Sequence, residues 1–146
     1  MTILAMFLAA ALGWQGADAA TTVRVYVFTA PAGSGAQSPE EQGRADAVRD
    51  MRDALGRKKG VTLVAERTDA SVVVEVLGRE QRDEPAGAFG GKSVTRMGDT
   101  IIRLRVRSGD DESDLKGIGQ GTWGRAAKDA ADRFMKWISR REPKRI

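Results

Sequence analysis

The sequence predicts an α+β domain: a mostly antiparallel sheet of about five strands with two helices on one face, in the order β-α-β-β-β-β-α. Three observations lead to this prediction. Apolar and polar residues alternate soon after residue 21, a capped helix begins near Ser38, and an alanine-rich helical stripe lies near the end of the chain. The 146 residues contain no internal repeat and have the length of one domain.

The first twenty residues have the layout of a secretory signal peptide. An apolar run from Ile3 to Trp14 is followed by small residues and an A-x-A triplet at 17–19. The run is shorter than the roughly 20 residues that a membrane-spanning helix needs. Because the terminal amine is the only charge before it, an N-terminal core helix and a retained signal anchor remain alternatives.

We expect residues 1–20 to be cleaved on export, which leaves a domain at 21–140 and a basic tail at 141–146. The mature protein would be periplasmic or secreted and would keep no transmembrane anchor. The sequence does not predict its oligomeric state.

The first half of the domain reads as strand, helix, strand. Residues 22–28 alternate valines with Arg24, Tyr26 and Phe28, which is typical of a strand with one buried face. Ser38 and Glu41 form a capping box around Pro39, and apolar side chains then recur at helical spacing up to Gly56. A short strand follows at 61–65.

The second half reads as three strands and a helix. Residues 71–77 form a nearly continuous apolar strand, and 81–99 is a polar, glycine-rich loop. Strands at 100–107 and 114–118 flank an acidic hairpin turn. Thr122 caps the last helix, whose apolar face includes Trp123, Phe134 and Trp137. We expect Phe134 and Trp137 to anchor this helix on the core.

This arrangement resembles small envelope domains of Gram-negative bacteria, namely the curli-secretion lipoprotein domain and periplasmic activators of peptidoglycan synthases. The residues that carry the resemblance are the V-x-V-F strand at 25–28, the late alanine-rich helix, and the stretch from Leu63 through Asp69 and Ala70 to Val74. The resemblance implies an assembly or accessory role without catalysis. The lipid-bearing Cys of those proteins is absent here, and with it their membrane anchor.

The composition excludes several kinds of active site. His and Cys are both absent, so the chain has no thiol nucleophile, no Ser–His–Asp triad and no His/Cys zinc site. We therefore expect no cofactor, no metal and no enzyme activity. The formal net charge of +4 favours anionic partners only mildly, and export argues against nucleic acid.

The main candidate site is a face with several arginines. Arg103, Arg105 and Arg107 alternate along one strand and therefore share one face of the sheet. If the first strand is their neighbour, Arg24, Tyr26 and Phe28 join them. Such a face could bind an anion or another partner. The simpler interpretation is a solvated face with cross-strand ion pairs, such as one to Glu75.

Three other patterns have simpler explanations. The loop at 86–93 matches a loosened phosphate-loop pattern, but no helix or parallel βαβ unit is predicted around it. The acidic cluster at 110–114 could bind Ca²⁺ but lacks the spacing of a calcium loop, so a solvated turn is favoured. Carboxylates along 40–53 alternate with arginines as helix-surface pairs.

The leading hypothesis is an exported, non-catalytic accessory or binding module of the bacterial cell envelope. Its partner would be an envelope protein or an anionic surface. The alternative is a polyanion-binding protein that uses the arginine face, and the third hypothesis is a small carboxylate-dependent hydrolase.

Overall fold

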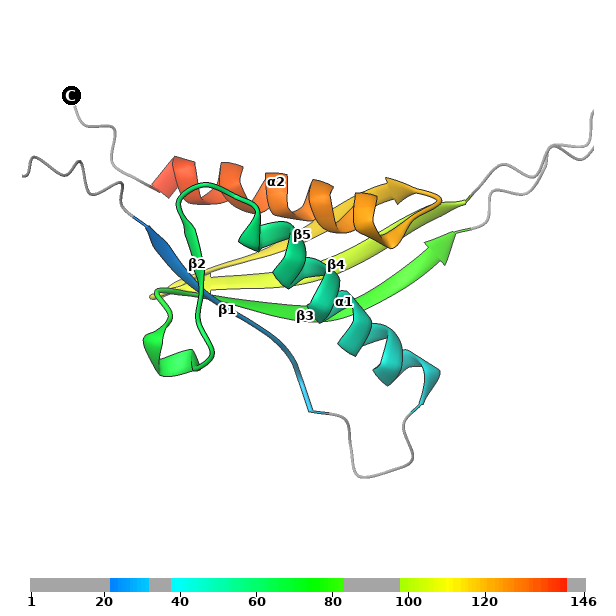
Figure 1. Cartoon of the computed structure of the whole chain (residues 1–146), viewed down its shortest axis with the longest axis horizontal. Helices are drawn as coiled ribbons and strands as arrows, with labels where there is room; N and C mark the ends of the chain where they lie inside the picture. The colour runs from blue at the N-terminus through cyan, green and yellow to red at the C-terminus, as the bar shows by residue number, and fades with distance from the viewer. Residues whose placement is uncertain (1–21, 32–37, 83–97, 142–146) are drawn as a thin grey trace, which may run out of the picture.

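The computed structural model describes residues 22–31, 38–82 and 98–141, which form a five-stranded sheet and two helices (Figure 1). Its elements are β1 (Val23–Thr29), α1 (Pro39–Gly56), β2 (Val61–Leu63), a 3-10 turn η1 (Arg67–Asp69), β3 (Val72–Arg82), β4 (Asp99–Ser108), β5 (Asp111–Gln120) and α2 (Trp123–Arg141). This order confirms the predicted α+β class. The predicted leader, the phosphate-loop pattern at 86–93 and the tail beyond Arg141 lie outside the described residues.

The sheet is mixed, with the strand order β2-β1-β3-β4-β5. β1 runs parallel to both of its neighbours, β2 and β3, whereas β3, β4 and β5 form an antiparallel meander. The antiparallel pairs are the longer ones, so most of the ladder is antiparallel, as predicted. The two edges differ in length: β2 has three residues and β5 has ten.

Local sequence signals explain the ends of α1. The Ser38 hydroxyl accepts from the Glu41 N–H, and the Glu41 carboxylate accepts from the Ser38 N–H at 3.0 Å. This reciprocal pair is the predicted capping box, which satisfies two N–H groups at the start of the helix. α1 ends at Gly56, and Gly60, with a φ of 80°, turns the chain into β2.

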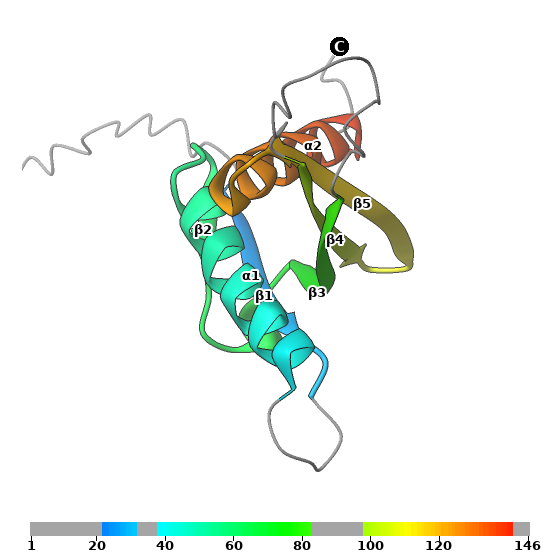
Figure 2. The ribbon, with the colours of Figure 1, turned by 90° about the vertical axis from the view of Figure 1, so that its right-hand side faces the viewer.

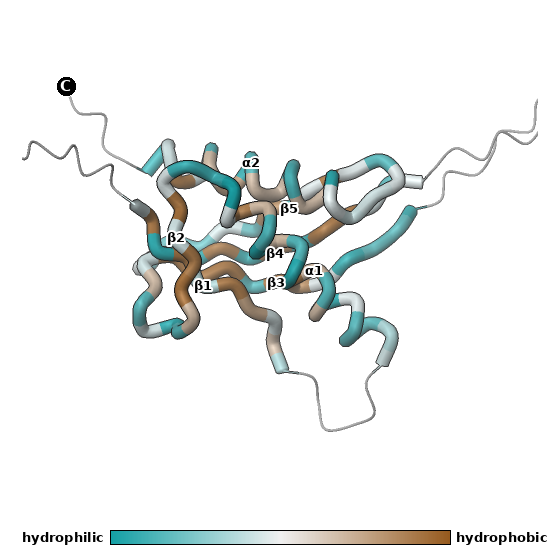
Figure 3. Tube along the Cα trace, viewed as in Figure 1, coloured by the Kyte–Doolittle hydropathy of each residue, from teal (hydrophilic) through white to brown (hydrophobic). Residues whose placement is uncertain are grey.

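A single apolar core lies between the sheet and both helices, which cover the same face (Figure 2). Figure 3 shows hydrophobic residues concentrated along the central strands and hydrophilic residues along α1. The largest fully buried side chains are Phe134, Met51, Leu55, Ile102, Leu104, Val25, Val74, Val76 and Val106. Phe134 is therefore the central anchor of α2, whereas Trp137 and Trp123, also predicted on this face, are only partly buried.

Two glycines of β5 allow α2 to approach the sheet closely. A Cβ atom built on Gly117 would overlap the carbonyl oxygen of Ala126 and the backbone of Ala130, and one built on Gly119 would overlap the backbone nitrogen of Ala126. Small residues therefore face each other at this end of the helix. Near its other end, Leu115 and Trp137 stand between strand and helix, and Figure 1 shows α2 and β5 moving apart there.

A hydrogen-bonded threonine reinforces the beginning of α2. The Thr100 hydroxyl is buried and lies 2.8 Å from the Gly119 carbonyl oxygen and 2.9 Å from that of Thr122. The Thr122 hydroxyl in turn accepts from the Arg125 N–H at 3.4 Å, as the predicted cap requires.

β3 is longer than predicted because a bulge interrupts its alternation. The register shifts between Val76 and Gly78, so Arg79 lies on the face that the valines before the bulge occupy. The Arg79 guanidinium lies 3.2 Å from Asp46 of α1 and 4.5 Å from the Trp123 ring centre of α2. This arginine joins both helices to the sheet. Because the residues around it in the sequence are polar, the strand was predicted to end before it.

The hairpin is also longer than predicted. β5 begins at Asp111, because only Gly109 and Asp110 make the turn and Gly109 supplies the positive φ of 59°. Asp111 contacts Arg141 at the far end of α2.

Gly117→Ala should destabilise the domain by about 1–3 kcal/mol or more, because the added methyl group must push α2 away from β5. Chemical denaturation measures this change. Gly78→Ala is the matched control, since no atom lies within 4 Å of a Cβ there and its φ is ordinary. Equal stability of the two variants would show that α2 is not seated as described.

Candidate binding face

The predicted site residues lie on the sheet face that the helices leave uncovered, which we call the open face. Alternation along each strand defines it, because the neighbouring residues point into the core. Its residues include Arg24, Tyr26 and Phe28 of β1, Val73, Glu75 and Glu80 of β3, Ile101, Arg103, Arg105 and Arg107 of β4, and Glu112, Asp114, Lys116 and Ile118 of β5.

β1 and β4 are not neighbours, contrary to the condition under which Arg24 and Tyr26 would join the arginines. β3 lies between them, because it pairs with β1 on one side and with β4 on the other. One row across the sheet therefore reads Phe28, Glu75, Arg105, Asp114. Opposite charges face each other along this row.

Each of the three β4 arginines has an acidic partner. Arg105 Nε lies 2.9 Å from Asp114 and 3.3 Å from Glu112. Arg107 Nε lies 2.5 Å from Glu112, and its Nη2 lies 3.9 Å from Glu75.

Arg103 completes the ladder through a bidentate contact of 3.3 Å to both oxygens of Glu80. The predicted cross-strand ion pairs are therefore present, including the one to Glu75. Glu80, Glu112 and Asp114 were not among the sequence-predicted partners, because their positions opposite the arginines depend on the strand register.

These contacts shift the protonation of the ladder. The hydrogen bond from Arg105 lowers the pKa of Asp114 below its ordinary value, against a smaller opposing effect of desolvation, and the same bond raises the pKa of Arg105. The hydrogen bond from Arg103 likewise lowers the pKa of Glu80. All three groups are at least partly exposed to water, which screens each pair and weakens its contribution to stability.

The β1 side of the open face is aromatic. The rings of Tyr26 and Phe28 stack with centres 5.7 Å apart and an angle of 16° between their planes. The Arg67 guanidinium of η1 lies 5.7 Å from the Phe28 ring centre. Arg24 lies at the β1 end nearest η1, where it pairs with Asp69 at 3.8 Å. Both rings are partly exposed, so a partner can contact them.

The open face therefore combines an aromatic stack with a charge ladder that is neutralised from within. A polyanion would have to compete with the acidic partners of each arginine. A protein surface with its own alternating charges can instead exchange ion pairs with the ladder. Such a face offers a partner both exposed aromatic rings and paired charges.

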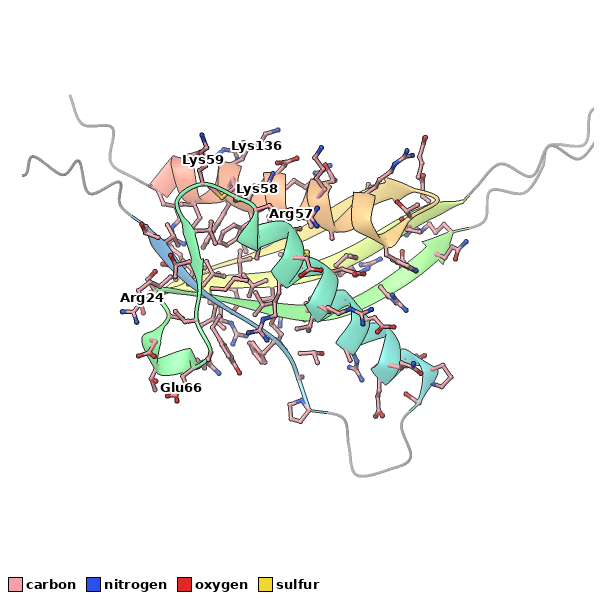
Figure 4. All side chains as sticks on the ribbon, in the orientation of Figure 1. Arg24, Arg57, Lys58, Lys59, Glu66 and Lys136 are labelled. Atoms are coloured by element: carbon pink, nitrogen blue, oxygen red, sulfur yellow. The ribbon has the colours of Figure 1, made fainter. Side chains whose placement is uncertain are left out.

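Positive charge that is only partly neutralised lies instead on the helical side, at positions that were not singled out from the sequence. Arg57, Lys58 and Lys59 follow α1, and Figure 4 shows Lys136 of α2 close to this turn. Lys58 contacts Asp132, and this hydrogen bond is the main reason why the pKa of Asp132 is lowered. The sequence signal was the run of three basic residues, which looked like an ordinary turn.

Several of the remaining acidic candidates take part in ion pairs. In the 110–114 cluster, Asp111 contacts Arg141, and Glu112 and Asp114 belong to the ladder. Among the α1 carboxylates, Asp46 pairs with Arg79 and Arg49. Within residues 22–31, 38–82 and 98–141, no three acidic side chains gather as a metal site would require. None of the helices described there is long and apolar enough to cross a membrane.

Comparisons with known proteins identify no family. No protein-family model and no curated protein matches the chain. One similar solved structure is the NMR structure of an uncharacterized lipoprotein B from Nitrosomonas europaea, with 12% identity over 81% of this chain and 83% of that chain and a TM-score of 0.43.

Another is a crystal structure of a candidate lipoprotein from Caulobacter crescentus CB15, with 14% identity over 82% of this chain and 93% of that chain and a TM-score of 0.35. Both TM-scores are below 0.5, so neither likeness supports a conclusion about function. The resemblance to curli-secretion and peptidoglycan-synthase-activator domains stays a prediction.

Stability should decrease on acidification, and the ladder should contribute to this loss. Because the folded-state pKa values of Asp114 and Glu80 are lowered, the unfolded chain binds protons first as the pH falls below about 4. Replacing both with Asp114→Asn and Glu80→Gln should make the decline between about pH 4 and pH 2 shallower. Denaturation at a series of pH values tests this, with the exposed turn variant Asp110→Asn as control. Identical slopes for all three proteins would contradict it.

Proposed function

We propose that this chain is an exported, non-catalytic binding module of the bacterial cell envelope, and that it binds a protein partner on the open face. The export part rests on the leader pattern at 1–20, and the envelope part on the resemblance described for residues 25–74 and for the late alanine-rich helix. The observation that carries the binding role is the stacked Tyr26–Phe28 pair beside an internally neutralised arginine ladder.

Tyrosine, phenylalanine and arginine are the residue types suited to a protein interface. Aromatic and arginine side chains are enriched at interface cores, where a few of them supply most of the binding energy. Tyr26 and Phe28 are already ordered against each other and against Arg67, so little side-chain entropy is lost when a partner covers them. The surrounding charges then form a polar rim that selects a partner with complementary charges.

The double variant Tyr26→Ala/Phe28→Ala should lose its partner and keep its fold. We expect capture from an envelope fraction, with residues 21–146 as bait, to fall by about tenfold or more, because two aromatic anchors of a few kcal/mol are removed. Circular dichroism checks the fold. The matched control is Trp123→Ala, an aromatic truncation on the opposite side of the sheet. Undiminished capture by the double variant would refute binding through this face.

The alternative function is polyanion binding through the β4 arginines. The ladder argues against it, because the acidic partners of Arg103, Arg105 and Arg107 already occupy them. Cations without an ion-pair partner in the described part of the chain, such as Arg57, Lys59 and Lys128, are better placed to hold an anion weakly. A measurement of salt dependence separates these two sets of residues.

Retention on heparin resin should be weak and salt-labile, and it should depend on the helical side. Replacing Arg57, Lys59 and Lys128 with Gln should lower the eluting salt concentration more than replacing Arg103, Arg105 and Arg107, although both variants lose the same charge. Stronger dependence on the three β4 arginines would favour the alternative. Wild-type retention beyond about 0.5 M salt would do the same, because surface charges are then largely screened.

A further inference from the structure

β5 is an edge strand whose outer side is only partly covered. The Ile118 N–H points away from β4 and donates to Asp129 of α2 at 2.9 Å, and the Gln120 carbonyl accepts from Arg125 at 3.4 Å. The Gly121 N–H, in contrast, points inward to the Gly98 carbonyl. Outward and inward groups alternate in an antiparallel ladder, so the backbone groups of Glu112, Asp114 and Lys116 also point outward.

No described residue of α2 forms a hydrogen bond with the outward backbone groups of Glu112, Asp114 and Lys116. Asp129 and Arg125 cover the C-terminal end of the edge, where Gly117 and Gly119 let α2 lie against the strand. Along the preceding residues, the described part of the chain supplies no hydrogen-bond partner to the outward groups. Unpaired strand edges of this kind accept an additional strand.

A groove of about 660 Å³ runs along this uncovered stretch, and we call it the edge groove. It opens where α2 and β5 diverge. Its sheet side is formed by Ser113–Lys116 of β5 together with Leu77 of β3 and Arg103 and Leu104 of β4. Its helix side includes Asp129, Arg133, Lys136, Trp137 and Arg140. Leu115 and the partly exposed ring of Trp137 supply an apolar surface for side chains, while the strand backbone supplies hydrogen-bonding groups.

The charges around the edge groove are unbalanced. Its acidic residues are already engaged, because Asp129 pairs with Arg133 at 2.9 Å, Asp132 with Lys58, and Asp114 with Arg105. Lys116, Lys136 and Arg140 also line the groove, and none of them has an ion-pair partner among the described residues. An occupant with carboxylates would neutralise these three cations.

We propose that the edge groove binds an extended, acidic segment of another polypeptide, which pairs with β5 as a sixth strand. Backbone hydrogen bonds to residues 112–116 hold the segment, alternate apolar side chains contact Leu115 and Trp137, and its carboxylates approach Lys116, Lys136 and Arg140. This second surface adjoins the open face and shares Arg103, Asp114 and Lys116 with it, but it does not include the Tyr26–Phe28 pair that carries the proposed function.

A synthetic peptide provides the probe: alternating Glu and Val, capped at both ends, and about eight residues long, as an average-sized strand. Calorimetry with the domain should detect its binding. A version with Lys in place of Glu should bind more weakly, since like charges then meet. A version N-methylated at every residue keeps the charge but has no N–H donors, and it should bind roughly tenfold more weakly or not at all.

Position 114 allows the same test on the protein. Asp114→Pro removes an outward N–H without breaking the β4 ladder, and Asp114→Ala is its matched control, because it removes the same carboxylate but keeps the N–H. We expect roughly tenfold weaker peptide binding for the proline variant than for the alanine variant. Lys116→Gln/Arg140→Gln should also weaken binding, whereas Arg57→Gln/Lys59→Gln, outside the groove, should not.

Three results would overturn the proposal. The first is undiminished binding of the N-methylated peptide, and the second is equal binding by the proline and alanine variants; either would show attraction by charge alone. The third is no binding of the Glu–Val peptide to the wild type. The variant Tyr26→Ala/Phe28→Ala should bind the peptide normally. A negative result in the peptide experiments therefore does not affect the open-face function, and a negative result in the capture experiment does not affect the edge groove.

Discussion

The contact between α2 and the glycines of β5 is the constraint on which the rest of the structure depends. Gly117 and Gly119 bring the backbone of Ala126 and Ala130 against the strand, and this seats the following turns so that Phe134 fills the core. The same contact fixes Trp123 beside Arg79. Because side chains of ordinary size stand between strand and helix only farther along, the helix is inclined to the strand and the edge groove opens between them.

The two sides of the sheet differ in how far their positive charges are neutralised by carboxylates. On the open face, each β4 arginine is matched by a carboxylate on a neighbouring strand, so the face is polar without a strong field. On the helical side, carboxylates such as Asp132 are outnumbered by the lysines near them, which leaves net positive charge around α2. The modest overall charge therefore conceals a strong asymmetry. Each side is suited to a chemically different kind of contact.

Features that depend on local chemistry could be predicted from the sequence, and those that depend on strand neighbours could not. The capping box at Ser38, the end of α1 at Gly56 and the alternation along β4 are local signals, and the structure confirms them. The bulge after Val76 breaks the period of two, which concealed both the end of β3 and the role of Arg79. Spacing alone was enough to place the β4 arginines on one face. Their ion-pair partners could not be predicted without the register of β5, and their separation from Tyr26 could not be predicted without knowing that β3 lies between β1 and β4.

The position of β1 has a consequence for the order in which the chain folds. β1 is an inner strand, and Val25 pairs with Val72, so one of its two sides stays open until β3 becomes available; under the proposed export, β3 crosses the membrane later than β1. The meander from β3 through α2 contains mostly local pairings, whereas the β1–β3 pairing closes a long loop. We therefore expect the last part of the chain to emerge to fold first and then to serve as the template on which the earlier part docks.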